Sequence, residues 1–395
     1  MSSSSSKLLD NVVDLINKAK LEAKEQKIYL LIQVKELCMN RDSSILPEVI
    51  PMVAEFQQTD FNANCRKFVA GFLREVVRAH PQHVSLVVPV ASYLMHDSST
   101  VVKKNAVLLA NTIYRPALQR LVDNGSAKGA QQDWSTLDGL RKVVLNTITS
   151  GPADISMVAV KFAESVVLAC VGGRGLAPGA SREGDKSVQR KLSPSHPFLL
   201  ADTLDQAGHA LARQMIGWLG TSDSDSGSVG SGVGGGVASA GANATAGTAG
   251  GGAAKVSGWG SGFGAQHYTV LINALQNLAT NRAALFADIV PALASALESV
   301  NGNGNGRGKA KAGVAGKKGP AATAVVPKGL RDAGGSLRSA CLKLLKVAPG
   351  PSKSVQRLAV AAALSGSDGE AKAAVDGNAT LKGRIKLPVR VRERP

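Results

Sequence analysis

The sequence predicts an all-α fold in which antiparallel helix hairpins stack into an α-solenoid. Apolar residues recur at i, i+3, i+4 and i+7 through most of the chain, which is the spacing of one helix face. Aromatic residues make up only 4% of the 395 residues, a composition that suits stacked helices better than sandwiches or barrels. A short motif that begins with aspartate also recurs four times, as a repeat architecture requires.

The helical pattern runs through residues 7–219 and resumes over 264–365. In residues 24–39, for example, Ile28 and Leu31 share one face. The other segments with this spacing are 62–79, 99–122, 196–219, 265–299, 330–347 and 352–365. We therefore predict helical repeats over both regions, with roughly ten to thirteen helices and no sheet.

Four stretches lack this pattern and are predicted to be disordered. Residues 220–263 are almost wholly Gly, Ser, Ala, Thr and Asp, and 300–328 interrupt the second helical region with an NGNGNG run. Such compositions cannot bury enough apolar area to offset the entropy cost of ordering. The N-terminus 1–6 and the basic tail 366–395 complete the set.

The repeated motif aligns four segments that each start at an aspartate. They are DFNANCRKFVAGFL from Asp60, DSSTVVKKNAVLLA from Asp97, DISMVAVKFAESVV from Asp154 and DAGGSLRSACLKLL from Asp332. The first two aspartates are 37 residues apart, which is close to the period of HEAT and armadillo repeats. We interpret each aspartate as a cap for free N–H groups of the second helix of its hairpin. The predicted fold class is therefore a HEAT/armadillo-type α-solenoid.

The net charge of +17 favours acidic partners such as RNA, phosphorylated peptides or acidic proteins. Much of the excess lies outside the periodic segments. Residues 307–318 hold five cations and no acid, and residues 382–394 hold six cations and one acid. Solvated tail charge without a partner is the alternative interpretation.

The four cysteines are predicted to be buried, reduced thiols of a cytosolic or nuclear protein, because none forms a CxxC pair and each lies in an apolar helical stretch. The N-terminus shows no apolar segment of the signal-peptide type. We also interpret every apolar stretch as too short to span a bilayer, so no membrane partner is expected.

No set of catalytic residues emerges from the sequence. Gly230, Gly232 and Gly235 match GxGxxG by letter, but they lie in a Gly/Ser tract with no preceding strand. The six histidines include no HExxH, and no GxSxG motif is present. We therefore predict no enzymatic activity, no cofactor, no metal and no small-molecule substrate.

Basic residues follow the repeat aspartates, among them Lys103, Lys104 and Lys161. A single lysine in such a position can be solvated charge whose aliphatic stem covers the core. Taken as a row, these lysines would lie on second helices, which we expect to form the concave wall of the solenoid. The row therefore predicts a partner-binding face.

Six segments carry a resemblance to a known family. They are VVDLINKA (12–19), KIYLLIQVKEL (27–37), CRKFVAGFLREV (65–76), VVKKNAVLLANTIYRPALQ (101–119), AVKFAESVV (159–167) and HPFLLADTLDQAGHALARQMIGWL (196–219). In order and spacing they resemble the N-terminal domain of the symplekin family of cleavage and polyadenylation scaffolds. The resemblance covers most of residues 8–219 and continues more weakly through 266–299 and 330–365.

The resemblance implies a nuclear scaffold for mRNA 3′-end processing, with other cleavage and polyadenylation factors as partners. It also implies a specific partner, a cysteine-dependent phosphatase of the RNA polymerase II C-terminal domain (CTD), which such domains bind and stimulate. The stretch from Lys161 through Phe162 to Glu164 matches the family's KFVEG stretch. We therefore expect these residues to contact the phosphatase, with Lys103 and Lys104 beside them.

Two other functions stay open at the level of sequence. The charge of +17 and the basic tail suit a helical-repeat RNA-binding protein with weak contact through the tail, although few aromatic residues are available to stack on bases. A transport-type adaptor shares the architecture, but it would need many more repeats than this length supplies.

Overall fold

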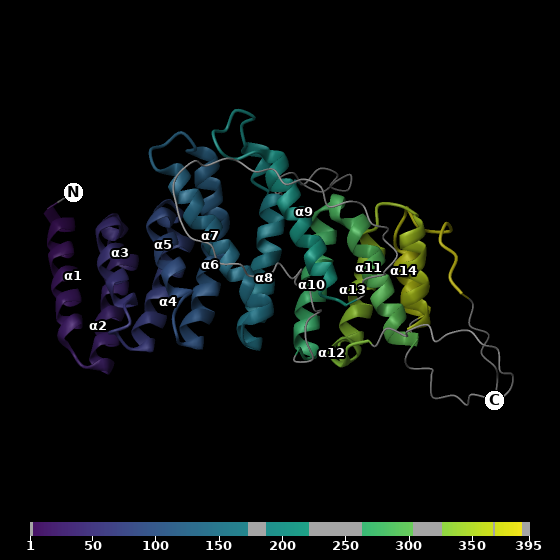
Figure 1. The fold of residues 1–395 in the computed structure, drawn as a ribbon, viewed down its shortest axis with the longest axis horizontal. Helices are drawn as coiled ribbons and strands as arrows, with labels where there is room; N and C mark the ends of the chain where they lie inside the picture. The colour runs from purple at the N-terminus through teal and green to yellow at the C-terminus, as the bar shows by residue number, and fades with distance from the viewer. Residues whose placement is uncertain (1–2, 173–186, 221–262, 303–325, 366–367, 389–395) are drawn as a thin grey trace, which may run out of the picture.

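The computed structural model describes residues 3–172, 187–220, 263–302, 326–365 and 368–388, and these residues form fifteen α-helices and no strand. The helices run side by side along the molecule from one end to the other (Figure 1). The all-α solenoid is therefore confirmed. The count exceeds the predicted ten to thirteen partly because two helices, one of five residues and one of nine, are too short to show a clear period.

The helices fall into two layers, with one helix of each hairpin in each layer. The first layer consists of α1 (Ser3–Leu21), α3 (Leu46–Ala54), α5 (Val84–Leu94), α7 (Ala130–Ser150), α9 (Ala201–Gly217), α11 (Ala283–Gly302) and α14 (Lys353–Leu364). The second layer consists of α2 (Lys24–Glu36), α4 (Ala63–Ala79), α6 (Thr100–Asp123), α8 (Ala153–Cys170), α10 (Ala265–Asn281), α13 (Gly334–Val347) and α15 (Asp368–Asp376). The short helix α12 (Lys328–Asp332) precedes α13. Single turns of π or 3-10 helix lie at Leu37–Arg41, Ser43–Ile45, Glu55–Gln57, Pro81–His83 and Gln189–Lys191.

Each second-layer helix packs on the next, from α2 through α4, α6, α8, α10 and α13 to α15. The first layer forms two such runs, α1–α3–α5–α7 and α9–α11–α14. The core is one continuous apolar cluster that extends from Val12 in α1 to Leu381 beyond α15. This arrangement is what stacked repeats require, because a hairpin contacts mainly its neighbours.

The helix α4 shows how the local sequence sets these boundaries. It begins after Asn62, whose side-chain oxygen accepts a hydrogen bond from the Cys65 backbone N–H at 2.9 Å, as an N-cap residue does. Its core face carries Val69, Phe72 and Val76, all buried. The helix ends at Ala79, just before Pro81, since the residue preceding a proline disfavours the helical conformation.

The repeat aspartates do not all act as the helix caps that the sequence predicted. The α4 cap is Asn62 rather than Asp60, Asp154 lies inside the first turn of α8, and Asp332 is the last residue of α12. Asp97 accepts a hydrogen bond from the Ser99 backbone N–H at 2.7 Å, in the turn before α6. The aligned residues therefore share a register but serve different roles, because the loops before their helices differ.

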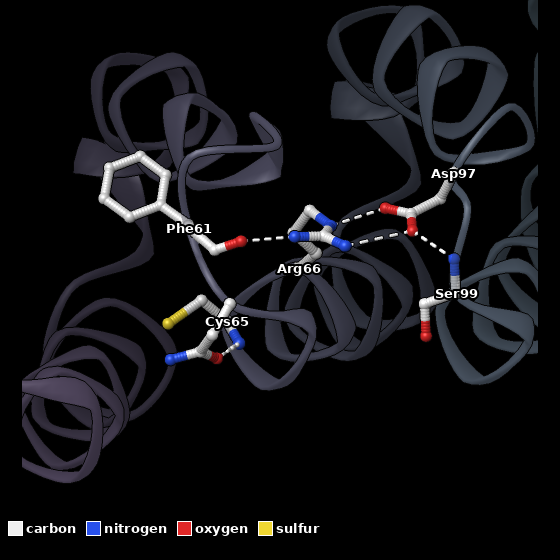
Figure 2. Close-up of polar contacts among 6 residues, drawn as sticks. Phe61, Cys65, Arg66, Asp97 and Ser99 are labelled. Carbon is white, nitrogen blue, oxygen red and sulfur yellow. Dashed lines mark hydrogen bonds and ion pairs between the residues drawn. The ribbon is translucent and has the colours of Figure 1, made fainter.

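The main role of Asp97 is a buried ion pair with Arg66 of the preceding hairpin (Figure 2). The Arg66 guanidinium donates to the two carboxylate oxygens at 2.5 and 3.1 Å, and it also donates to the carbonyl of Phe61. The two side chains are only 8% and 3% exposed. The pair joins the start of α4 to the loop before α6 and so fixes one hairpin against the next.

The pair also sets the ionisation of both groups. Burial alone would raise the pKa of Asp97, but the hydrogen bonds from Arg66 and Ser99 and the nearby positive charges outweigh burial, so the pKa lies below its ordinary value. The hydrogen bond with Asp97 in turn raises the pKa of Arg66. Both groups are therefore charged over the whole neutral range.

Three predictions about the ends of the helical regions need correction. The helix α1 begins at Ser3, inside the stretch 1–6, because Ser5 is anchored through a hydrogen bond to the Asp42 carboxylate at 2.7 Å. The helix α11 continues to Gly302, three residues beyond residue 299, where the predicted helical segment 265–299 ends. The third is the predicted insertion 300–328, whose last residue, Lys328, begins the helix α12. Residues 221–262 and 303–325 of the predicted disordered insertions lie outside the described residues.

Residues 368–388 of the predicted tail are also more ordered than predicted, since α15 and the residues after it pack onto the last hairpin. Residues 366–367 and 389–395 lie outside the described residues. Ala371, Ala374 and Val375 of α15 are buried. The Asn378 side-chain amide donates to the carbonyls of Leu345 and Ala348 at 2.9 and 3.0 Å. It thereby satisfies carbonyls at the end of α13, which a helix terminus leaves without partners.

The helix α11 corrects the expectation that every apolar stretch is too short to span a bilayer. By length and composition it is the one helix in the described residues that could cross a membrane. In the fold it packs against α10, α13 and α14, and Ile289, Val290 and Leu293 are fully buried. It therefore behaves here as a core helix.

Removing one member of the buried ion pair should be costly. We expect Asp97→Ala to lower the free energy of unfolding by about 3–5 kcal/mol, because Arg66 is left charged and buried without its partner. The double variant Arg66→Met/Asp97→Leu should recover most of that loss, since two apolar side chains of similar size need no partner. Urea denaturation of the three proteins measures this, and a double variant as unstable as the single one would contradict it.

Acidification provides an independent test of the same pair. Because the folded-state pKa of Asp97 is depressed, its contribution to stability is complete above the unfolded value of about 3.9 and is lost as the pH falls through the folded value. The wild type should therefore lose more stability than the double variant as the pH falls from about 5 to about 2. Denaturant midpoints across this range measure the difference. Parallel curves for the two proteins would show that the pKa of Asp97 is the same in the folded and unfolded states.

Candidate partner-binding surface

The predicted contact residues lie on two neighbouring helices of the second layer. Lys103 and Lys104 belong to the first turns of α6, and Lys161, Phe162 and Glu164 belong to the middle of α8. The helices α6 and α8 are packed side by side. The structure therefore brings the predicted residues onto adjacent helices, but it gives them different exposures and different roles.

Lys161 is the most accessible member of the α8 group. Its side chain is 46% exposed, and its ammonium group donates to a carboxylate oxygen of Glu164 at 3.0 Å. The Glu164 side chain is only 9% exposed. Its other carboxylate oxygen accepts a hydrogen bond from the side-chain amide of Asn277 on α10. Lys161 is thus paired with an acid that is itself anchored to the next hairpin.

Glu164 therefore corrects the sequence-based expectation for this position. Its side chain is buried and is bonded to both Lys161 and Asn277. Glu164 therefore positions Lys161, and little of its own surface is accessible to a partner. Asn277 is the residue that sequence reasoning missed. It lies 113 residues from Glu164, and no local pattern links the two.

Phe162 cannot contact a partner, contrary to the prediction. Its side chain is fully buried, and its ring meets that of Tyr114 edge-on, with centroids 5.4 Å apart and planes at 78°. This is a favoured geometry for an aromatic pair. Phe162 instead packs α8 against α6 through Tyr114, and so helps to position the neighbouring Lys161 on the surface.

The two α6 lysines lie close to acids. Lys104 is paired with Asp154 of α8 at 3.4 Å, with both side chains about half exposed. Lys103 is partly buried, and its charge helps to lower the pKa of Asp97. A partially solvated pair such as Lys104–Asp154 can exchange its partner at small cost, so Lys104 is available for a new contact whereas Lys103 is less so.

The surface around Lys161 mixes charge with apolar area. Met157, Val158 and Leu168 of α8 are partly exposed and follow the same helical spacing as Lys161. Such a stripe offers apolar contact area next to a fixed cation. It is chemically suited to a protein surface that presents a carboxylate or carbonyl group beside apolar side chains.

A metal site requires several converging ligands, and a reactive cysteine requires a lowered thiol pKa. No group of three or more His, Cys, Asp and Glu residues that could hold a metal lies within them. The four cysteines are free and buried, as predicted. Burial raises the pKa of Cys38 and Cys341 to about 12 and that of Cys170 to about 11, so these thiols are protonated and unreactive at neutral pH.

A comparison with protein families identifies this part of the chain. Residues 99–245 match the family model described as Symplekin/PTA1 N-terminal. The match includes α6 and α8, which carry the predicted contact residues, and it confirms the resemblance to a symplekin-type protein. It also supports a role as a scaffold in mRNA 3′-end processing. The resembling segments 12–19, 27–37 and 65–76 lie outside the matched range.

The anchoring role of Glu164 can be tested by stability. We expect Glu164→Ala to cost about 1–3 kcal/mol, because the partly buried amide of Asn277 loses a charged acceptor. The matched control is Asp154→Ala, which removes an exposed partner of Lys104 and should cost less than about 1 kcal/mol. Denaturant melts of both variants measure the difference. Equal losses would mean that Glu164 is no more than a surface acid.

Proposed function

On the premise that residues 99–245 carry a Symplekin/PTA1 N-terminal domain, we propose that this chain is a non-enzymatic scaffold that binds a CTD phosphatase of RNA polymerase II. The binding surface is centred on Lys161 and includes Lys104 of the neighbouring helix. The observation that carries this proposal is the exposed, pre-positioned ammonium group of Lys161 within the stretch that resembles the family's contact segment.

The geometry supports a binding role for Lys161 in energetic terms. Fixing a flexible lysine on binding usually costs side-chain entropy. Here the Lys161 ammonium already contacts Glu164, which is itself bonded to Asn277, so part of this entropy cost is met within the chain. A cation ordered in advance can meet a carboxylate or a carbonyl-rich loop of the phosphatase at a smaller entropic cost.

We propose that the protein acts in the nucleus, with further cleavage and polyadenylation factors as additional partners. This rests on the family match and on the shape of the molecule. An elongated two-layer stack offers a long surface relative to its mass (Figure 1), and such surfaces suit proteins that hold several partners at once.

RNA binding is a second candidate, favoured by a specific observation at the C-terminal end. Lys382, Arg384 and Lys386 are exposed, and the segment that carries them is held against α14 by paired hydrogen bonds between the Gln356 side chain and the Lys386 backbone. Strongly exposed aromatic side chains in the described residues lie elsewhere, at Tyr29 and Tyr93. RNA contact at this end would therefore be electrostatic and would weaken steeply with added salt.

Lys161→Ala is the decisive variant for the phosphatase proposal. It should weaken binding to the CTD phosphatase by about 1–2 kcal/mol if Lys161 is a central contact. Folding should change little, because a partly exposed ion pair contributes little to stability. Isothermal titration calorimetry with the purified phosphatase measures the affinity.

The matched control for this titration is Lys142→Ala. Lys142 also belongs to an ion pair within one helix, with Asp138, but it lies on α7 in the first layer. This variant should bind the phosphatase with wild-type affinity. If both variants bind as the wild type does, Lys161 lies outside the binding surface and the proposal is wrong.

A further inference from the structure

The second layer carries a hollow near the N-terminal end that the proposed phosphatase surface does not use. It lies over α2, α4 and α6, and its open volume is about 950 Å³. Its lining includes Ile28 of α2, Asn105 of α6 and a face of α4 that runs from Lys67 to Arg74. It contains none of the residues around Lys161. We call it the glycine hollow, after Gly71 at its centre.

The surface of α4 at Gly71 is open. A Cβ atom added at Gly71 would meet nothing within 4 Å, so no neighbouring element fills the space above it. Glycine in the middle of a helix costs about 0.5–1 kcal/mol relative to alanine. Glycine therefore lowers the stability of α4 at this position. It also leaves a stretch of helix backbone that another chain can approach closely.

The walls beside Gly71 are apolar. Ile28 and Phe68 are partly exposed into the hollow, one from α2 and one from α4. The Phe68 ring lies parallel to that of Phe72, with centroids 6.3 Å apart, and Phe72 is buried. The floor is thus held rigidly from below, and an apolar side chain placed over Gly71 would be covered by Ile28 and Phe68.

The charges at the hollow are only partly neutralised. Lys35 and Glu75 pair with each other at 2.8 Å. Within the described part of the chain, Lys67 and Arg74 have no ion-pair partner, and the Nε atom of Arg74 is buried without a hydrogen-bond acceptor. The Arg74 side chain as a whole is partly exposed and lines the hollow, so an incoming carboxylate can pair with its charge.

We propose that the glycine hollow binds an acidic peptide segment of a partner protein. One apolar side chain of the peptide lies over Gly71 between Ile28 and Phe68, and flanking carboxylates meet Arg74 and Lys67. Glu25 and Glu75 also line the hollow, and Glu75 is already paired with Lys35, so Lys67 and Arg74 are the cations that the carboxylates of the peptide meet. This surface is independent of the phosphatase surface on α8.

The test uses a short fluorescein-labelled peptide in which aspartates flank a central leucine, with binding followed by fluorescence anisotropy. The blocking variant is Gly71→Leu, which places a side chain where that of the peptide would lie; its Cβ atom has room, and leucine favours the helix more than glycine does, so the melting temperature should be kept or raised. We expect it to weaken peptide binding by at least about tenfold. Lys67→Glu, a charge reversal at an exposed site, should weaken binding by a similar factor.

The matched control is Gly139→Leu. Gly139 lies in the middle of α7, in the first layer, and a Cβ atom there would also meet nothing within 4 Å. This variant should bind the acidic peptide as the wild type does. The phosphatase affinity of Gly71→Leu should also be unchanged, which separates this inference from the proposed function.

Several outcomes would overturn the proposal. One is the absence of wild-type binding to the acidic peptide. Others are equal binding of a peptide with asparagines in place of the aspartates, or tighter binding of a phosphoserine peptide or of an oligouridine RNA. Full binding by Gly71→Leu would show that the peptide lies elsewhere on the molecule.

Discussion

Each helix pair of this solenoid needs its neighbours, because one hairpin cannot bury both of its apolar faces. The core is accordingly a single cluster that runs from α1 to the residues beyond α15. Stability in such a stack is approximately the sum of repeat and interface contributions. The interfaces between hairpins are therefore the elements on which the remaining structure depends, and every functional surface is built across at least one of them.

Apolar packing alone is not directional, and buried polar contacts supply the missing specificity between hairpins. Arg66 and Asp97 join the second pair to the third. The Arg282 side chain, which is almost fully buried, donates to the Leu168 carbonyl, and the His267 ring contacts the Ala153 carbonyl at 2.8 Å. The Leu168 carbonyl lies in the last turn of α8, where carbonyl groups lack partners within the helix. These contacts fix the register of each repeat against the next.

The same interfaces create the two candidate binding surfaces. Lys161 is oriented because Glu164 reaches across to Asn277 on α10. The glycine hollow exists because α2, α4 and α6 enclose a stretch of α4 that carries no side chain at Gly71. One surface offers an ordered cation beside apolar area. The other offers an apolar floor next to an unsatisfied guanidinium. Two surfaces of different chemistry on one rigid stack are consistent with a scaffold that holds more than one partner.

The sequence by itself determined the fold class, because the helical spacing of apolar residues and the recurring register encode which faces must be buried. It also identified the stretch around Lys161 and predicted the buried thiols. It placed Phe162 and Glu164 in the contact surface, whereas both side chains are buried in the structure. It also placed Asp97 at a helix cap, whereas Asp97 is paired with Arg66. Only the tertiary structure decided these roles. Exposure and pairing depend on residues that lie 31 or 113 positions away, and local periodicity carries no information about contacts across a hairpin interface.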